Sequence, residues 1–319
     1  MNLFRILAKR IALGIVAAWA VLTAVFAMFT LGEDWAFRGQ EGALRFAGAS
    51  EDEVEAAQEQ YLAERGLDRP ASEQYVDWLW SMLTLDWGNS FLADEPAFSL
   101  VVSAVDRTAM YVVPALAIGI IIGILIGLYA GLNPDSRLAN GGLRSAYLLF
   151  ALPNFWIGGL LFSTVWDWNR GHPLFAYSPM VFEHMLPIVL TTTTLLGGYA
   201  SYTRAHSLEY TSADFVTLVR TKGASRLRIA RHVVRNAAIP WFSMLFTEAL
   251  ALLVLSVFVI ETLFGIEGIG LLLMNAAHGQ DVPVLLGGTL VIIAVGVLGN
   301  IIQDVSYNIL DPRVDTGTR

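Results

Sequence analysis

The stretch TAMYVVPALAIGIIIGILIGLYAGLNP, residues 108–134, contains no charged residue. A helix needs roughly 20 such residues to cross about 30 Å of hydrocarbon, so this stretch is long enough to span a membrane. Small residues recur in it at every fourth position, namely Ala115, Gly119, Gly123, Gly127 and Gly131. Lipid provides no hydrophobic drive for helices to associate, so small residues in one register indicate a face where a second helix packs closely.

Further apolar runs extend this prediction to the whole chain. The mean hydropathy is +0.56 and only 15% of the residues are charged, which is too apolar for a soluble domain of 319 residues. The runs 11–32, 145–166, 185–203 and 282–303 are free of charge, and the run 236–260 is interrupted only by Glu248. We therefore predict an all-α integral membrane protein with six transmembrane helices, at about 11–32, 108–133, 145–166, 185–206, 238–260 and 284–306.

The distribution of Lys and Arg predicts the orientation. The segments that would share a side with the N-terminus are rich in Lys and Arg, whereas the short loops on the other side hold only Arg170. Positive charge collects on the cytoplasmic side, so both termini are predicted to be cytoplasmic. The first span follows Arg5, Lys9 and Arg10, has a long apolar core and lacks an A-x-A-like site, which indicates an uncleaved signal anchor.

Segment 33–107 is predicted to face outward, and it carries a net charge of −11. In it Ser50 and Glu53 form a capping-box pattern, and Gly66 is placed to end the helix that they begin. A second helix is predicted beyond it, with four aromatic residues suited to the membrane–water interface: Tyr75, Trp78, Trp80 and Trp87. The acidic composition with only two lysines favours a halophilic archaeal source, although a GC-rich genome would also favour Arg.

The predicted inner loop between the fourth and fifth spans contains the stretch RTKGASRLRIARHVVRNAAIP, residues 220–240, with six of the twenty Lys and Arg residues. Upstream of it, Ser212 is predicted to cap a short helix that has Asp214 in its first turn. Gly223 follows this helix, where a left-handed residue is expected. Ser225 is predicted to cap a second helix that ends at Pro240, so the loop forms a helix–glycine–helix elbow.

Two stripes are predicted along the second helix of the elbow. The apolar stripe contains Leu227, Ala230, Val234 and Ala237, and the basic stripe contains Arg228, Arg231 and Arg235. A basic amphipathic helix can lie on anionic lipid, bind nucleic acid or dock on a protein. A short loop between spans argues against nucleic acid. The glycine turn favours docking on a protein, and lipid contact stays open.

Polar residues inside the spans are candidates for the transport pathway, because an uncompensated charge or amide is costly in lipid. Pro153 is predicted to kink the third span, and the neighbouring Asn154 either supports this kink or lines a pathway. Glu248 is a candidate cavity or gate residue in the fifth span, with a buried hydrogen-bonded role as the alternative. Glu261 is a weaker candidate, and both Glu261 and Asp304 are expected to cap or anchor span ends.

Several function classes lack their sequence signals. Neither Lys9 nor Lys222 follows a glycine, so no P-loop is present, and no H-E-x-x-H or G-x-S-x-G occurs. The five histidines are dispersed and there is no cysteine, so neither a metal site nor a catalytic residue is predicted. An ion-coupled secondary transporter remains the alternative, although no inverted repeat is detected.

The chain resembles a known family. The segment DFVTLVRTKGASRLRIARHVVRNAAIP, residues 214–240, is similar to the cytoplasmic "EAA" loop of permease subunits in binding-protein-dependent ABC importers, and most similar to the dipeptide, oligopeptide and nickel class. The Glu-Ala-Ala triplet itself is replaced by Thr217, Leu218 and Val219. Other similar segments occur in the same order, at 66–91, 152–161, 261–273, 280–285 and 309–314.

This resemblance implies a type I importer permease fold, with an N-terminal region at 1–96, a permease domain at 97–309 and a cytoplasmic tail at 310–319. It also implies that loop 212–240 couples the spans to an ATPase subunit. The coupling residues would be Asp214, Thr217, Leu218, Arg220, Gly223, Ala224, Arg228, Arg231, Arg235 and Pro240.

The implied partners are a homologous second permease, two ATP-binding subunits that hold ATP and Mg²⁺, and a substrate-binding protein outside the cell. The chain itself is expected to bind no cofactor and no nucleic acid, and to lie in the cell membrane of a prokaryote. The implied cargo is a dipeptide or oligopeptide, with oligosaccharides or nickel as alternatives.

Overall fold

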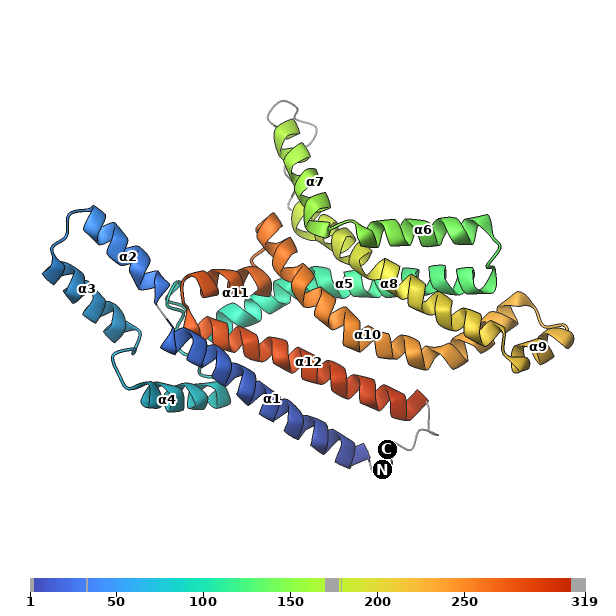
Figure 1. Ribbon diagram of the computed structural model, residues 1–319, viewed down its shortest axis with the longest axis horizontal. Helices are drawn as coiled ribbons and strands as arrows, with labels where there is room; N and C mark the ends of the chain where they lie inside the picture. Colours follow the sequence, from blue (N-terminus) through green and yellow to red (C-terminus); the bar gives the residue numbers. More distant parts are fainter. Residues whose placement is uncertain (1–2, 33, 170–177, 179, 311–319) are drawn as a thin grey trace. The chain divides into compact units, whose positions relative to one another are not determined.

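The computed structural model describes residues 3–32, 34–169, 178 and 180–310, and the side chains of 242–255 and of some other helical residues lie outside the description. The regular elements in the described residues are all helices (Figure 1). They are α1 (Leu3–Leu31), α2 (Trp35–Phe46), α3 (Glu51–Glu64), α4 (Ala71–Thr84), α5 (Ala97–Leu132), α6 (Arg137–Ala151), α7 (Asn154–Asn169), the π-helical turn η2 (Met180–Met185), α8 (Leu186–Thr211), α9 (Asp214–Thr221), α10 (Arg226–Phe264), α11 (Ile269–His278) and α12 (Val282–Leu310).

The helices confirm the predicted class of integral membrane protein. In the described residues four helical stretches, those of α1, α5, α8 and α12, are long and apolar enough to cross a membrane. The count reaches six if α6 with α7, and the end of α10 with α11, each form one interrupted span. The predicted tail at 310–319 lies outside the described residues beyond Leu310.

Contacts divide the chain into two compact units, which are described separately. Unit 1 consists mainly of Arg107–Ile266, and unit 2 consists of Ala8–Asp106 together with Glu267–Val297. In unit 1, helix α8 packs against both α6 and α10.

The glycine face of α5 lies against α8. A Cβ atom built on Gly123 would come within 2.5 Å of the Tyr199 Cβ, and one on Gly127 would come within 2.5 Å of the Ala200 carbonyl oxygen. Gly131 is equally close to Ser207, and Gly119 lies next to Leu195. The Cβ on Gly127 would also come within 2.7 Å of the Thr203 Cβ, so the α8 side chains at this face, those of Leu195, Tyr199, Thr203 and Ser207, are four apart as well. This is the close packing of helices that small residues allow in lipid.

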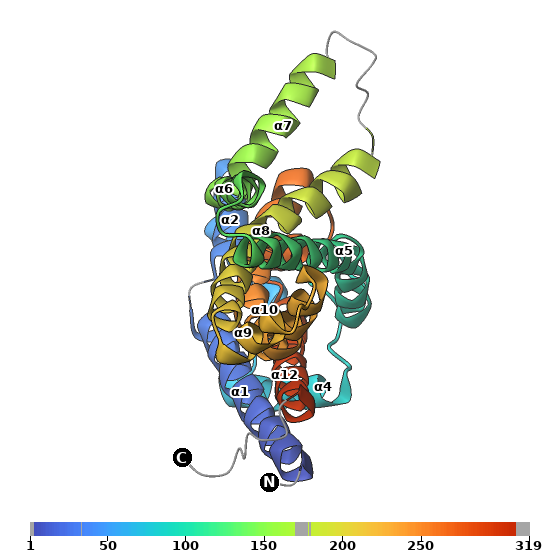
Figure 2. The ribbon, with the colours of Figure 1, turned by 90° about the vertical axis from the view of Figure 1, so that its right-hand side faces the viewer.

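The third predicted span is interrupted at the predicted kink. Helix α6 ends at Ala151, α7 begins at Asn154, and the two axes differ by 80° (Figure 2). Pro153 lies at the break, as the kink prediction required, because proline has no N–H to continue the helix. The predicted end of the second elbow helix at Pro240 was wrong, since α10 runs without interruption from Arg226 to Phe264.

In unit 2 the acidic segment begins with two short helices. The capping box of α3 is confirmed: the Ser50 side chain accepts from the Glu53 amide, and the Glu53 carboxylate accepts from the Ser50 amide at 2.8 Å. These hydrogen bonds lower the pKa of Glu53. The left-handed Gly66 (φ +65°) follows the end of α3, also as predicted.

The four aromatic residues predicted for the membrane–water interface differ in their exposure. Trp78 and Trp87 are buried, and Tyr75 is partly buried against α1. Only Trp80 has a largely exposed side chain, because the other three face neighbouring helices of unit 2.

We expect Gly127→Ala to destabilise the protein by about 1–3 kcal/mol, because the new methyl group would meet the α8 backbone and force the two helices apart. Gly141→Ala in α6 is the matched control, since its Cβ would meet nothing within 4 Å and alanine favours the helix. Thermal unfolding in detergent measures both variants. Equal stability of the two would contradict the close contact between α5 and α8.

Candidate functional site

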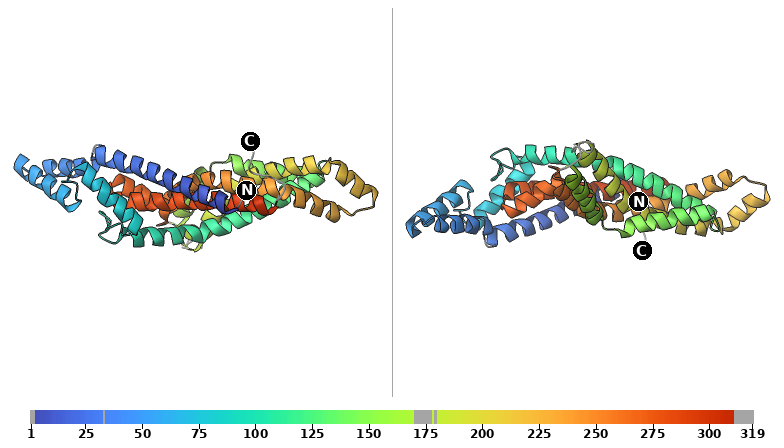
Figure 3. Two further views of the ribbon diagram at one scale, coloured as in Figure 1. Left: turned by 90° about the horizontal axis from the view of Figure 1, so that it is seen from below. Right: turned by 90° about the horizontal axis from the view of Figure 1, so that it is seen from above.

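The elbow between α8 and α10 is built around Gly223, whose φ of +77° confirms the predicted left-handed conformation (Figure 3). The Ala224 amide donates to the Val219 carbonyl at 3.2 Å, which closes the C-terminus of α9. The Ser225 hydroxyl then accepts from the Arg228 amide at 3.4 Å, so the predicted cap of α10 is also confirmed. Local hydrogen bonds thus define the turn on both sides of Gly223.

The predicted role of Ser212 was wrong. Ser212 ends α8, where its amide donates to the Leu208 carbonyl and its hydroxyl donates to the Glu209 carbonyl. The carbonyl that begins α9 belongs to Ala213, which accepts from Val216 at 3.0 Å. The serine hydroxyl therefore binds the preceding helix and does not cap the following one.

The elbow is held to the membrane helices by an apolar cluster of buried side chains. Val216 of α9 packs with Ile229 and Val233 of α10. Partly buried side chains from α5, α8 and the turn complete the cluster, namely Leu128, Leu132, Tyr210 and Ala224. The packing joins α9 and the start of α10 to the ends of α5 and α8, so the elbow is one packed unit.

This cluster corrects the predicted apolar stripe. In the described side chains of α10 as far as Ala237, the buried residues are Ile229, Val233 and Ala237, of which only Ala237 belongs to the predicted stripe. Leu227 is 81% exposed and Val234 is also exposed. Both sets have helical spacing, but only the first faces α9. Arg228, Arg231 and Arg235 are exposed as predicted.

Together these residues leave an exposed surface on the elbow, which combines apolar and basic side chains. Leu218 on α9 is 57% exposed, and Leu227 lies just beyond the turn. The predicted coupling residues Asp214 and Thr217 are exposed as well. Arg220 and Pro240 lie in helices, but their side chains are outside the described residues. Exposed leucines together with exposed arginines are compatible with a protein interface.

A second candidate site lies where the third span breaks. The Asn154 amide nitrogen donates to the Leu190 carbonyl at 2.8 Å and to the Thr194 hydroxyl, and its oxygen accepts from Thr193 at 3.3 Å. These bonds attach the start of α7 to α8. They supply polar partners next to the interrupted backbone, as a broken helix in a membrane requires.

A cavity of about 330 Å³ opens beside Asn154 in unit 1. Thr194 and Ser256 add polar side chains to it, and the remaining lining is apolar: Phe150, Leu152, Pro153, Phe155, Val259 and Ile260. Thr194 and Ser256 were not predicted from the sequence as residues of this site. The run of four threonines at 191–194 inside an apolar span was the available signal for the first, whereas only the fold brings Ser256 to the cavity.

Glu261 is fully buried near the end of α10 and faces α5. Its carboxylate oxygen Oε1 accepts from the Thr108 hydroxyl at 2.6 Å and from the Tyr111 hydroxyl at 3.0 Å. Ile260, the residue before Glu261, lines the cavity beside Asn154, so Ile260 and Glu261 face different surroundings. Glu248 lies in α10, but its side chain is outside the described residues.

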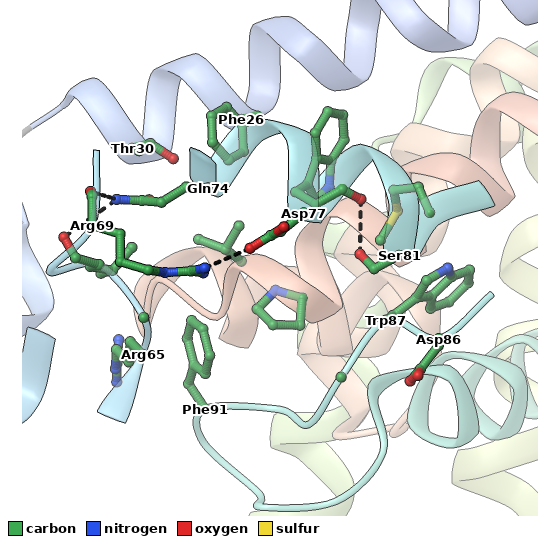
Figure 4. A pocket seen from close by; sticks show the side chains of 17 residues that line it. Phe26, Thr30, Arg65, Arg69, Gln74, Asp77, Ser81, Asp86, Trp87 and Phe91 are labelled. Carbon is green, nitrogen blue, oxygen red and sulfur yellow. Dashed lines mark hydrogen bonds and ion pairs between the residues drawn. The ribbon is translucent and has the colours of Figure 1, made fainter. Parts of the chain in front are cut away.

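Unit 2 contains a separate cavity of about 390 Å³ among α1, the segment between α3 and α4, α4 with the residues that follow it, and the start of α12. Figure 4 shows aromatic side chains and polar side chains around it, including the ion pair of Arg69 with Asp77 at 2.6 Å. Arg65 stacks over the rings of Tyr61 and Phe91 at its edge. No sequence motif predicted this cavity, because its walls come from three separate segments.

We expect Glu261→Leu to destabilise the protein by about 1–3 kcal/mol for each hydroxyl left without its acceptor. Glu261→Gln keeps an oxygen acceptor and should retain most of the stability. Thermal unfolding of the two variants in detergent gives the comparison. Equal melting temperatures would show that the Thr108 and Tyr111 hydrogen bonds do not anchor α5 to α10.

Comparison with known proteins gives a consistent result. Residues 123–316 match the family described as "Binding-protein-dependent transport system inner membrane component". A putative peptide transport system permease protein of Brucella abortus is 32% identical over 84% of this chain and 86% of its own length. The oligopeptide transport system permease protein AppB of Bacillus subtilis is 27% identical over 82% and 86%. The dipeptide transport system permease protein DppB of Escherichia coli is 28% identical over 80% and 84%.

Proposed function

The chain belongs to the family of binding-protein-dependent transport system inner membrane components, and we propose that it conducts peptides as the permease subunit of an importer driven by separate ATPase subunits. The peptide cargo is supported by the printed names of its relatives, which are peptide, dipeptide and oligopeptide permeases. The cavity beside Asn154, with its amide and hydroxyl groups on an apolar wall, is compatible with a peptide in transit.

The observation that carries the proposal is the elbow at Gly223. Helix α10 has 39 residues and would measure about 58 Å at 1.5 Å per residue, nearly twice the roughly 30 Å thickness of the hydrocarbon. Its basic first turns therefore extend beyond the bilayer while its later turns lie within it. A force applied at Leu227 or Arg228 would reach the membrane through one continuous helix.

The proposed assembly follows from this arrangement. The elbows of this chain and of a homologous second permease each receive one ATPase subunit, which holds the ATP and Mg²⁺, and a substrate-binding protein delivers cargo to the opposite side. The positive charge of the elbow supports a cytoplasmic location for it and for both termini. The chain itself contributes positioning and a pathway, without a cofactor.

Gly223→Val is expected to insert and assemble normally but to lose most ATP-driven peptide uptake. A β-branched residue is strongly disfavoured at φ +77°, so the turn between α9 and α10 would be distorted. The measurement is uptake of labelled peptide into proteoliposomes that contain the whole transporter and its binding protein.

Gly223→Asn is the matched control, because asparagine tolerates the left-handed region and the added side chain would enter open space. It should retain most of the uptake. Normal uptake by Gly223→Val would rule out the elbow as the coupling element. Purification in mild detergent without any ATPase subunit would instead favour an ion-coupled transporter.

The halophilic source proposed from the composition has its own test. The exposed acids of α3 repel one another, and salt screens such repulsion between surface charges. We expect the melting temperature of the purified protein to be higher in molar KCl than at low ionic strength. Equal stability in the two conditions would remove the argument for a salt-requiring source.

A further inference from the structure

Helix α4 has two different faces. The face toward α1 is buried or partly buried: the Tyr75 hydroxyl lies 2.9 Å from both the Trp19 Nε1 and the Thr23 hydroxyl, and Trp78 stacks on Phe26 with ring centres 5.2 Å apart. The opposite face carries a stripe of exposed apolar side chains, Val76 at 64%, Trp80 at 68% and Leu83 at 72%. Their spacing of four and three residues places them on one side of the helix.

The contacts with α1 set the depth of α4. Phe26 lies five residues and Trp19 twelve residues before Leu31, the end of α1, which corresponds to about 8 Å and 18 Å along the axis. Half of the hydrocarbon layer measures roughly 15 Å. Because the first predicted span ends at about residue 32, a helix that touches α1 over this interval would lie at the depth of the lipid chains.

Contacts after α4 support the same depth. Trp87 is buried against α12, where a Cβ atom on Gly287 would come within 2.2 Å of its ring. Gly287 is five residues past Val282, the first residue of α12, which places it about 8 Å along that helix. Both ends of the α4 region are therefore packed against membrane helices of unit 2.

The polar groups of α4 from Asp77 onward are compatible with lipid, whereas the exposed Glu73 belongs to the first turn of the helix. The Ser81 hydroxyl donates to the Trp78 carbonyl at 2.8 Å and the Thr84 hydroxyl donates to the Trp80 carbonyl at 2.9 Å, so both are satisfied within the helix. The Asp77 carboxylate, near the N-terminal half, is neutralised by Arg69 at 2.6 Å (Figure 4). Residues 78–85 contain no charge.

We propose that α4 is embedded in one leaflet of the bilayer, without crossing it, and that Val76, Trp80 and Leu83 contact lipid chains. The occupant is inferred to be lipid because α4 packs on α1, a helix of the same unit that is long and apolar enough to span a membrane and that has exposed apolar side chains of its own. The leaflet is the extracytoplasmic one in the orientation proposed above, but the embedding itself does not depend on that orientation or on the cargo.

The absence of cysteine from the chain allows a direct test with single-cysteine spin labels. Val76→Cys and Leu83→Cys would report on the stripe, Met28→Cys on the exposed side of α1, and Glu59→Cys on the exposed side of α3. The labels are measured in the assembled transporter, reconstituted in phosphatidylcholine nanodiscs, by their collisions with oxygen and with a water-soluble nickel chelate.

The labels at 76 and 83 should collide more with oxygen than with nickel, as the label at 28 does, whereas the label at 59 should show the reverse. Nickel collisions at 76 and 83 equal to those at 59 would place α4 in water and overturn the proposal. Immobile labels that neither reagent reaches would show a protein partner on the stripe, which also overturns it. Peptide uptake by the same variants tests the transport function separately.

Discussion

The contact between the glycine face of α5 and helix α8 is the constraint on which unit 1 depends. Lipid chains are as apolar as leucine side chains, so burial of apolar surface does not drive these helices together. Close approach of the two backbones brings these helices together. It is possible because Gly123, Gly127 and Gly131 place no side chain between α5 and α8. Helix α8 then has its remaining faces available for α6 and α10.

Interruption of the helices creates the candidate pathway. A continuous apolar helix satisfies its own backbone and presents only side chains to its neighbours, so it offers a hydrophilic cargo few partners. The helical backbone is interrupted at Pro153, between α6 and α7. There the Asn154 side chain donates a hydrogen bond to the carbonyl of Leu190 on α8. The cavity with Thr194 and Ser256 lies beside these hydrogen bonds, at a place where the fold itself needs polar groups.

The elbow shows how a loop can be made rigid without many residues. Gly223 turns the chain, Ser225 starts the next helix, and the buried Val216, Ile229 and Val233 bind both helices to the membrane spans. Because α10 continues into the bilayer as one helix, its exposed first turns are mechanically part of the transmembrane unit.

Local chemistry determined much of this protein from the sequence alone: the apolar runs, the glycine register of α5, the left-handed Gly223 and the caps at Ser50 and Ser225. Each depends on residues close together in the chain, so the sequence carries the whole signal. The tertiary structure decided the rest, and α10 shows why. Leu227 with Val234 and Ile229 with Val233 are both valid apolar stripes, and only the positions of α5, α8 and α9 determine that the second is buried and the first is left exposed.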